Sequence, residues 1–218
     1  MKKHFLKRDI FVTLNGEGNG MKAYLQGHID YFCGVYAVIN SCRRVLRKDK
    51  IFSYNDGCLF YQNLMGFLMQ EGKLDEVLHH GTDFDLIMNM AEQGQRYVAE
   101  TFGTKISFTR PYTETHLPPA DVFDELAASL SDEKTSCIIR LSNKDVGDHW
   151  SVVSGKTAHG KIKLFDSYGY DGFDLKATLW LPDGIAAKQT PANPTGMPKP
   201  PKGKTYVAKQ GLIFLKAF

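Results

Sequence analysis

The feature that most constrains the fold is a change in the period of the hydrophobic pattern near residue 136. Before it, apolar residues recur every three or four positions, which is typical of helices that bury one face. After it, short apolar runs rich in β-branched residues are typical of strands. The pattern predicts helices over 33–47, 58–71, 84–102 and 119–130, and strands over 136–142, 149–155, 161–167 and part of 205–218. Helices followed by strands indicate an α+β fold with an antiparallel sheet.

Length and composition indicate one domain. The chain has 218 residues, of which 43% are hydrophobic and 23% charged, as in ordinary globular proteins with a sizeable core. We therefore expect a single domain over 1–218. The one biased segment, 181–204, holds six of the nine prolines. Because proline cannot donate to a β-ladder and disfavours a helical residue before it, this segment is predicted to be a long surface loop.

Charge and apolar runs limit the class of partner. A net charge of +3 does not call for nucleic acid or a membrane surface. The basic residues between positions 43 and 50 complement a helix C-terminus, and no aromatic residues interleave them. No apolar run approaches the roughly eighteen residues of a membrane span. Lys7, Arg8 and Asp9 interrupt the basic N-terminus before the core of a signal peptide can form, so a cytoplasmic protein is expected.

Cys33 is the cysteine best placed for chemistry, and the spacing of the four cysteines matches neither a disulfide framework nor a zinc site. Cys33 stands where a loop becomes the first predicted helix, and the positive end of a helix dipole favours a thiolate nucleophile. Gly34 leaves the backbone beside the sulfur unobstructed, so that the Cys33 N–H can face a developing oxyanion. A buried structural cysteine is the competing interpretation, which suits Cys42 and Cys137, and Cys58 is a weaker rival nucleophile.

His149 and Asp166 lie on the two predicted strands that flank the loop 155–160. If the hairpin closes symmetrically around that loop, the two residues are direct cross-strand partners, with Cβ atoms about 4.5–5.5 Å apart. A carboxylate there can accept a hydrogen bond from one imidazole nitrogen and leave the other for a thiol. Singly, a surface histidine and a turn-forming aspartate are the plainer interpretations, and the shared hairpin favours a functional pair.

Three segments together resemble the papain-like cysteine peptidase superfamily, above all its bacterial branch that includes the double-glycine leader peptidases. They are QGHIDYFCGVYAVIN at 26–40, HWSVV at 149–153 and KLFDS at 163–167. The resemblance implies a papain-like fold, with N-terminal helices and a central nucleophile helix packed on a C-terminal antiparallel sheet. Residues 50–135 match no motif of that superfamily.

The resemblance also implies the role of each site residue. Cys33 corresponds to the nucleophile, His149 to the base and Asp166 to the residue that orients the base, while Gln26 corresponds to an oxyanion donor. Gln26 precedes Cys33 by seven residues where six are usual in the superfamily. The implied reaction is cleavage of a peptide or amide bond through a thioester, without a metal or cofactor.

Two other functions are compatible with the same residues. Amidases, deamidases and acyl or amine transferases use the same three side chains, and acceptor choice depends on the shape of the pocket. A catalytically silent, papain-shaped binding module is the alternative outside enzymology, and it predicts an unreactive Cys33. The presence of Gln26, Cys33, His149 and Asp166 together favours an enzyme that acts on a peptide or protein.

Overall fold

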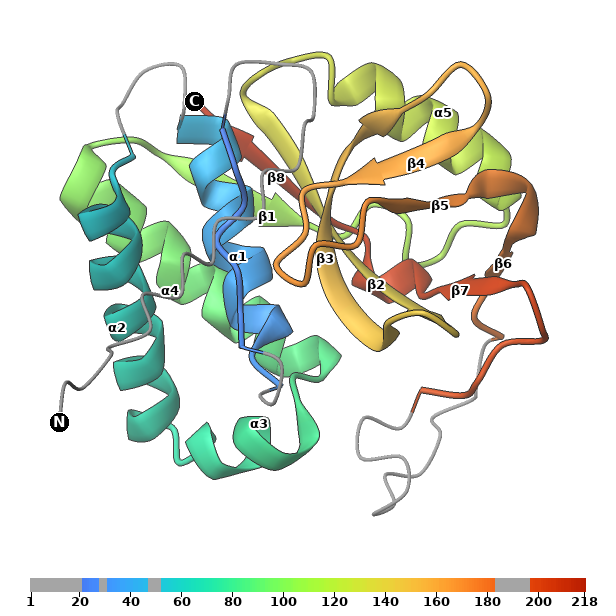
Figure 1. Ribbon diagram of the computed structural model, residues 1–218. Helices are drawn as coiled ribbons and strands as arrows, with labels where there is room; N and C mark the ends of the chain where they lie inside the picture. The colour runs from blue at the N-terminus through green and yellow to red at the C-terminus, as the bar shows by residue number, and fades with distance from the viewer. Residues whose placement is uncertain (1–20, 28–30, 47–51, 183–196) are drawn as a thin grey trace, which may run out of the picture.

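The computed structural model describes residues 21–27, 31–46, 52–182 and 197–218. These residues form an α+β fold, in which four helices gather on one side of a sheet and a fifth covers its other side (Figure 1). The helices are α1 (Cys33–Leu46), α2 (Tyr54–Gln70), α3 (Leu74–His80), α4 (Phe84–Phe102) and α5 (Pro119–Ser129). The predicted α+β class, with most helices before the sheet, is confirmed.

The sheet of the described residues has eight strands. They are β1 (Ile106–Thr109), β2 (Thr135–Asn143), β3 (Gly147–Lys156), β4 (Lys161–Leu164), β5 (Gly172–Asp174), β6 (Thr178–Trp180), β7 (Thr205–Val207) and β8 (Ile213–Ala217). The main path runs β1–β8–β2–β3–β4–β5, and every neighbouring pair along it is antiparallel. β7 also pairs with β2, and β6 pairs with β7 in parallel. The sheet therefore places the long β2–β3 hairpin near its centre.

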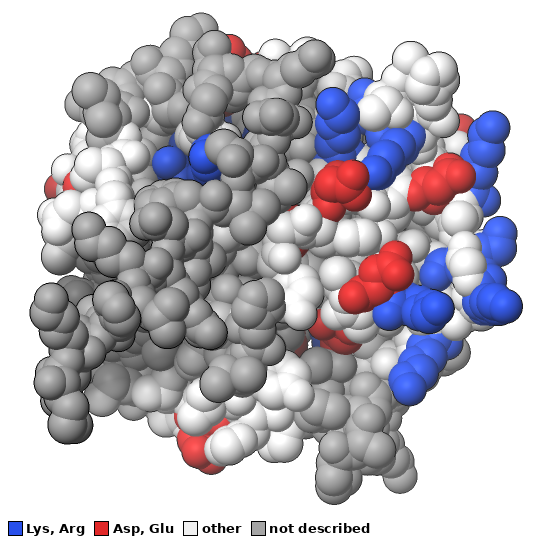
Figure 2. All heavy atoms as spheres, viewed as in Figure 1, with Lys and Arg blue, Asp and Glu red and all other residues white. Residues whose placement is uncertain are grey.

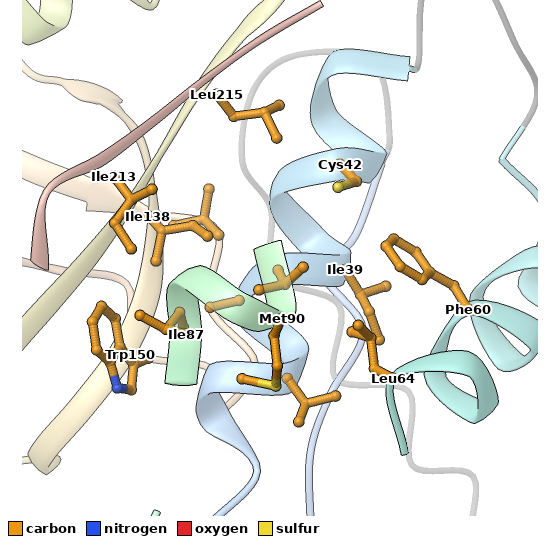
Figure 3. Close-up of a cluster of buried hydrophobic side chains, with 14 of the residues drawn as sticks. Ile39, Cys42, Phe60, Leu64, Ile87, Met90, Ile138, Trp150, Ile213 and Leu215 are labelled. Atoms are coloured by element: carbon orange, nitrogen blue, oxygen red, sulfur yellow. The ribbon is translucent and has the colours of Figure 1, made fainter. Parts of the chain in front are cut away.

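α1 is the central helix, between the sheet and the α2–α4 pair (Figure 1). It is covered on both sides, and eleven of its 14 residues are buried. In the core close-up, Ile39 of α1 lies near Phe60 and Leu64 of α2, with Met90 of α4 beside them (Figure 3). A second apolar cluster packs α5 against the opposite face of the sheet. This burial holds the first turn of α1 in a defined place beside β3.

Side-chain caps explain where two helices begin and end. α4 matches the predicted range 84–102, because Asp83 Oδ1 accepts the N–H groups of residues 85 and 86 at 3.1 and 2.7 Å, and Gly103 ends the helix with φ 64°. α2 begins at Tyr54, four residues before its predicted start. Ser53 and Asp56 form a capping box there, which satisfies two backbone N–H groups of the first turn.

The elements that the sequence did not predict are short. They are α3, β1, β5 and β6, and none exceeds seven residues, too few for a period to be recognised. In the predicted loop 181–204, the described residues 181–182 and 197–204 contain no helix or strand, and residues 183–196 lie outside the described part.

Over the side of the molecule occupied by β4 and β5, basic and acidic side chains are interspersed (Figure 2). Ion pairs there join Lys156 to Asp124 and Lys161 to Asp171.

Candidate active site

Cys33 is the first residue of α1, as its position in the sequence predicted. Its side chain is largely buried, with 8% exposed. Gly34 is required here for close packing, because a Cβ atom on it would lie 2.6 Å from Thr82 Oγ1. The carbonyl of Thr82 in turn accepts a hydrogen bond from Trp150 Nε1 at 2.8 Å. The start of α1 is thus fixed against the sheet through Thr82, and Trp150 is a packing residue of the core.

His149 and Asp166 form a buried pair. His149 Nε2 and Asp166 Oδ2 are 2.6 Å apart, and the two side chains are 5% and 1% exposed. The second carboxylate oxygen, Oδ1, accepts the backbone N–H groups of Tyr168 and Tyr170 at 2.8 and 3.0 Å. Three hydrogen bonds therefore hold the Asp166 carboxylate in one orientation, with its free lone pairs aimed at the imidazole.

The contact between His149 and Asp166 does not arise from the predicted register. The prediction of direct cross-strand partners is wrong, because the hairpin does not close symmetrically around 155–160: Lys156 pairs with Ile162, which displaces the pairing by three positions. A β-bulge between Val153 and Gly155 adds a residue to β3 and changes the pairing by one position, so that Val153 pairs with Leu164 at the end of β4. Asp166 follows the end of β4 and reaches His149 diagonally from a turn, so the two side chains meet by a different route.

Charge stabilisation outweighs burial at both members of the pair. Burial alone would lower the pKa of His149, but its hydrogen bond with Asp166 and the charge of the Cys33 sulfur raise that pKa well above its usual range. Burial alone would raise the pKa of Asp166, and the hydrogen bond and charge of His149 lower it instead. The geometry therefore favours an imidazolium held between a carboxylate and a sulfur.

Gln26 lies beside the same group. Its backbone N–H donates to the carbonyl of Ser167 at 3.0 Å, and the Ser167 hydroxyl donates to Gln26 Oε1 at 3.0 Å. The two contacts hold the backbone and the side-chain amide of Gln26 against Ser167. Ser167 is 3% exposed, so this arrangement is rigid. The sequence marked Ser167 only as part of a motif, and its contact spans 141 positions.

A cavity of about 170 Å³ brings three of the four predicted residues to one surface. Its lining consists of Gln26, Tyr31, Cys33, Asp145, Val146, Asp148, His149 and Tyr168. Asp166 lies behind His149 and does not line it. A larger cavity of about 550 Å³, beside the β3–β4 turn, contains none of the four. The chemistry of the lining, rather than its size, identifies the smaller cavity as the candidate site.

The other three cysteines differ from Cys33 in burial and neighbours. Cys42 and Cys137 are fully buried, and burial raises the pKa of both thiols far above the usual range. Their predicted interpretation as structural cysteines agrees with this burial. Cys58 is half-buried on α2 and faces Tyr54 rather than a histidine. Among the described cysteines, Cys33 is thus the one that lines a cavity together with a buried imidazole.

Comparison with known proteins adds little to this geometry. No family model matches the chain, and no curated protein matches it. Among solved structures, it is similar to the Pseudomonas avirulence protein AvrPphB, with 11% identity over 87% of this chain and 92% of that one, at a TM-score of 0.30. A likeness this weak carries no part of the argument, which rests on the residues themselves.

None of the helices in the described residues combines the length and the apolar character that a membrane crossing requires. Among the same residues, no His, Cys, Asp and Glu side chains gather in threes in a way that could hold a metal ion.

Proposed function

We propose that this chain is a papain-like cysteine hydrolase that cleaves a peptide or amide bond. The observation that carries the proposal is the alignment of three side chains across the two layers. Cys33, at the start of the central helix, lines the same small cavity as His149 and contributes to the raised pKa of its ring, and Asp166 holds Nε2 of that ring at 2.6 Å. Nucleophile, base and orienting group in contact are the signature of covalent acyl transfer.

The proposed reaction uses this alignment in two steps. The Cys33 sulfur attacks the carbonyl carbon of the substrate and forms a thioester, while His149 protonates the departing amine. His149 then takes a proton from water, which attacks the thioester and releases the acid. Asp166 keeps Nε2 occupied, so that the other ring nitrogen, Nδ1, faces the sulfur.

The oxyanion formed in each step is assigned to two donors. One is the backbone N–H of Cys33, which lies in the first turn of α1 and has no carbonyl four residues earlier within the helix. The other is the Gln26 amide, which Ser167 holds by its oxygen. Removing one such donor typically costs about 100- to 1,000-fold in turnover, so Gln26→Ala is expected to retain measurable but weak activity.

The test is site-resolved alkylation by iodoacetamide, read by mass spectrometry between pH 4 and 9. We expect Cys33 to label faster than Cys58 at acidic pH, and His149→Ala to remove that preference. Cys58 serves as the internal control, because it is half-buried and has no histidine partner among the described residues. Cys33→Ala is expected to abolish hydrolysis of a peptide library while unfolding at the same temperature as the wild type.

Two results would contradict the proposal. If Cys33 and Cys58 follow the same pH profile in the wild type, no thiol–imidazole pair operates, and the papain-shaped binding module becomes the better account. If Cys33→Ala retains full hydrolytic activity, the nucleophile is another residue.

A further inference from the structure

The end of the β2–β3 hairpin forms one wall of the candidate cavity. Asp145, Val146 and Asp148 line it there, opposite Cys33 and His149 of the same cavity. The wall is thus part of the surface that a substrate must touch before Cys33 can attack it.

Asn143 closes the turn that carries this wall. It is the last residue of β2 and is 7% exposed. Its Oδ1 accepts the backbone N–H groups of Asp145 and Val146 at 2.9 and 3.1 Å. Its Nδ2 donates to the Tyr170 hydroxyl at 2.8 Å. An amide side chain can accept two hydrogen bonds on its oxygen while donating from its nitrogen, so this position uses both ends of the group.

Tyr170 connects Asn143 to the buried pair. Its backbone N–H donates to Asp166 Oδ1, and its hydroxyl accepts from Asn143. The two contacts use different atoms of Tyr170. The loss of the hydroxyl would therefore remove the side-chain link between Asn143 and the Asp166 turn, while the backbone bond to Asp166 and the ion pair of Asp148 with Arg140 remain in place.

We propose that Asn143 and Tyr170 are positioning residues that lock the Asp145–Asp148 wall to the turn holding Asp166. This inference rests on the proposed hydrolase function. The lock sets the distance between a bound peptide and the Cys33 sulfur without touching either. A small electrophile reaches Cys33 without contacting Asp145, Val146 or Asp148, so its rate of reaction does not depend on the hydrogen bond between Asn143 and Tyr170. The affinity of a peptide that binds along those residues does depend on it.

The test compares two reagents on Tyr170→Phe. Iodoacetamide is the small probe, and a peptidyl vinyl sulfone, chosen from a panel as the fastest on the wild type, is the peptide probe. We expect the variant to react with iodoacetamide within twofold of the wild type and with an unchanged pH profile. Inactivation by the peptidyl reagent is expected to slow about 5- to 10-fold through a higher KI, the effect of one lost hydrogen bond.

A double-mutant cycle and a matched control separate this role from general destabilisation. In the Asn143→Ala background, Tyr170→Phe is expected to have no further effect on KI, because its partner is gone. Tyr112→Phe removes a hydroxyl contact with Glu125 in another part of the fold and is expected to leave both reagents unaffected.

The experiments distinguish a failure of the positioning role of Asn143 and Tyr170 from a failure of the proposed hydrolase function. If Cys33 labelling by iodoacetamide does not depend on His149, the proposed function fails. If that dependence holds but Tyr170→Phe leaves KI unchanged, slows both reagents equally, or adds to Asn143→Ala, the positioning role is refuted. A wild type that reacts with iodoacetamide yet with no peptidyl reagent also refutes it.

Discussion

Replacement of the buried carboxylate tests the electrostatics of the site most directly. Asp166→Asn keeps the size of the side chain and an oxygen that can accept from Tyr168 and Tyr170. It places an NH₂ group against His149 Nε2, so the ring must accept there and stay neutral. A charge-assisted bond between groups that are 5% and 1% exposed is thereby replaced by a neutral one.

The size of the destabilisation by Asp166→Asn, and its pH dependence, follow from the pKa shifts of His149 and Asp166. The folded-state pKa of His149 is raised from 6.5, so its stabilisation is complete below about pH 6.5 and is lost as pH rises through the folded value. The pKa of Asp166 is lowered from 3.8, so its share is complete above about pH 4 and is lost at lower pH. Breaking a buried ion pair lowers the free energy of unfolding by about 3–5 kcal/mol, and the neutral hydrogen bond that remains in Asp166→Asn offsets about 1 kcal/mol of that loss. We expect Asp166→Asn to lower the free energy of unfolding by about 3 kcal/mol at pH 6 and by under about 1 kcal/mol at pH 9.5.

The assay is urea unfolding at pH 6, 7.5 and 9.5, followed by the fluorescence of the two tryptophans, Trp150 and Trp180, of which Trp150 is 2% exposed in the fold. Asp124→Asn is the matched control, since its carboxylate is 62% exposed and pairs with Lys156 at the surface. It is expected to change the free energy of unfolding by less than about 0.5 kcal/mol at every pH. An Asp166→Asn effect that is constant or grows from pH 6 to 9.5 would refute the reasoning.

Two further predictions concern glycines and are checked by the same urea titration. Gly172→Ala should destabilise the fold by more than about 3 kcal/mol, because the new Cβ would lie 1.8 Å from the carbonyl oxygen of Ile162 at a residue with φ 137°. Gly66→Ala on α2, where no atom lies within 4 Å of the new Cβ, should instead stabilise it by up to about 1 kcal/mol, and equal effects would contradict both. Gly34→Ala should cost about 1–3 kcal/mol and slow Cys33 labelling, since Thr82 must move away from the start of α1; an unchanged free energy of unfolding would exclude that contact.

Local patterns predicted the helices well, because each is specified by its own residues. The 3.6-residue period of α1 predicted its start at Cys33, and the range 84–102 predicted for α4 agrees with the cap at Asp83 and the stop at Gly103 that the structure shows. The long strands near residues 136 and 149 were also recognisable from apolar runs. These predictions required no knowledge of distant contacts.

The geometry of the site depended on contacts that no local pattern encodes. The hairpin closes with Lys156 opposite Ile162, and the bulge between Val153 and Gly155 changes the pairing by one position, since a bulge is stabilised by the surrounding sheet rather than by its own residues. Ser167 and Gln26 meet across the layers, which only tertiary packing can bring about. The bond from Trp150 Nε1 to the Thr82 carbonyl likewise joins residues 68 positions apart.

The place of β8 in the sheet has a consequence during synthesis. β8 comprises residues 213–217, yet it is inserted between β1 and β2, which were made much earlier. A ribosome-bound chain that lacks this strand leaves both neighbours with unpaired edges, and the apolar face beneath α1 stays incomplete. Cys33 and His149 belong to opposite sides of that interface. We therefore expect Cys33 and His149 to reach their final separation only after β8 has emerged and docked between β1 and β2.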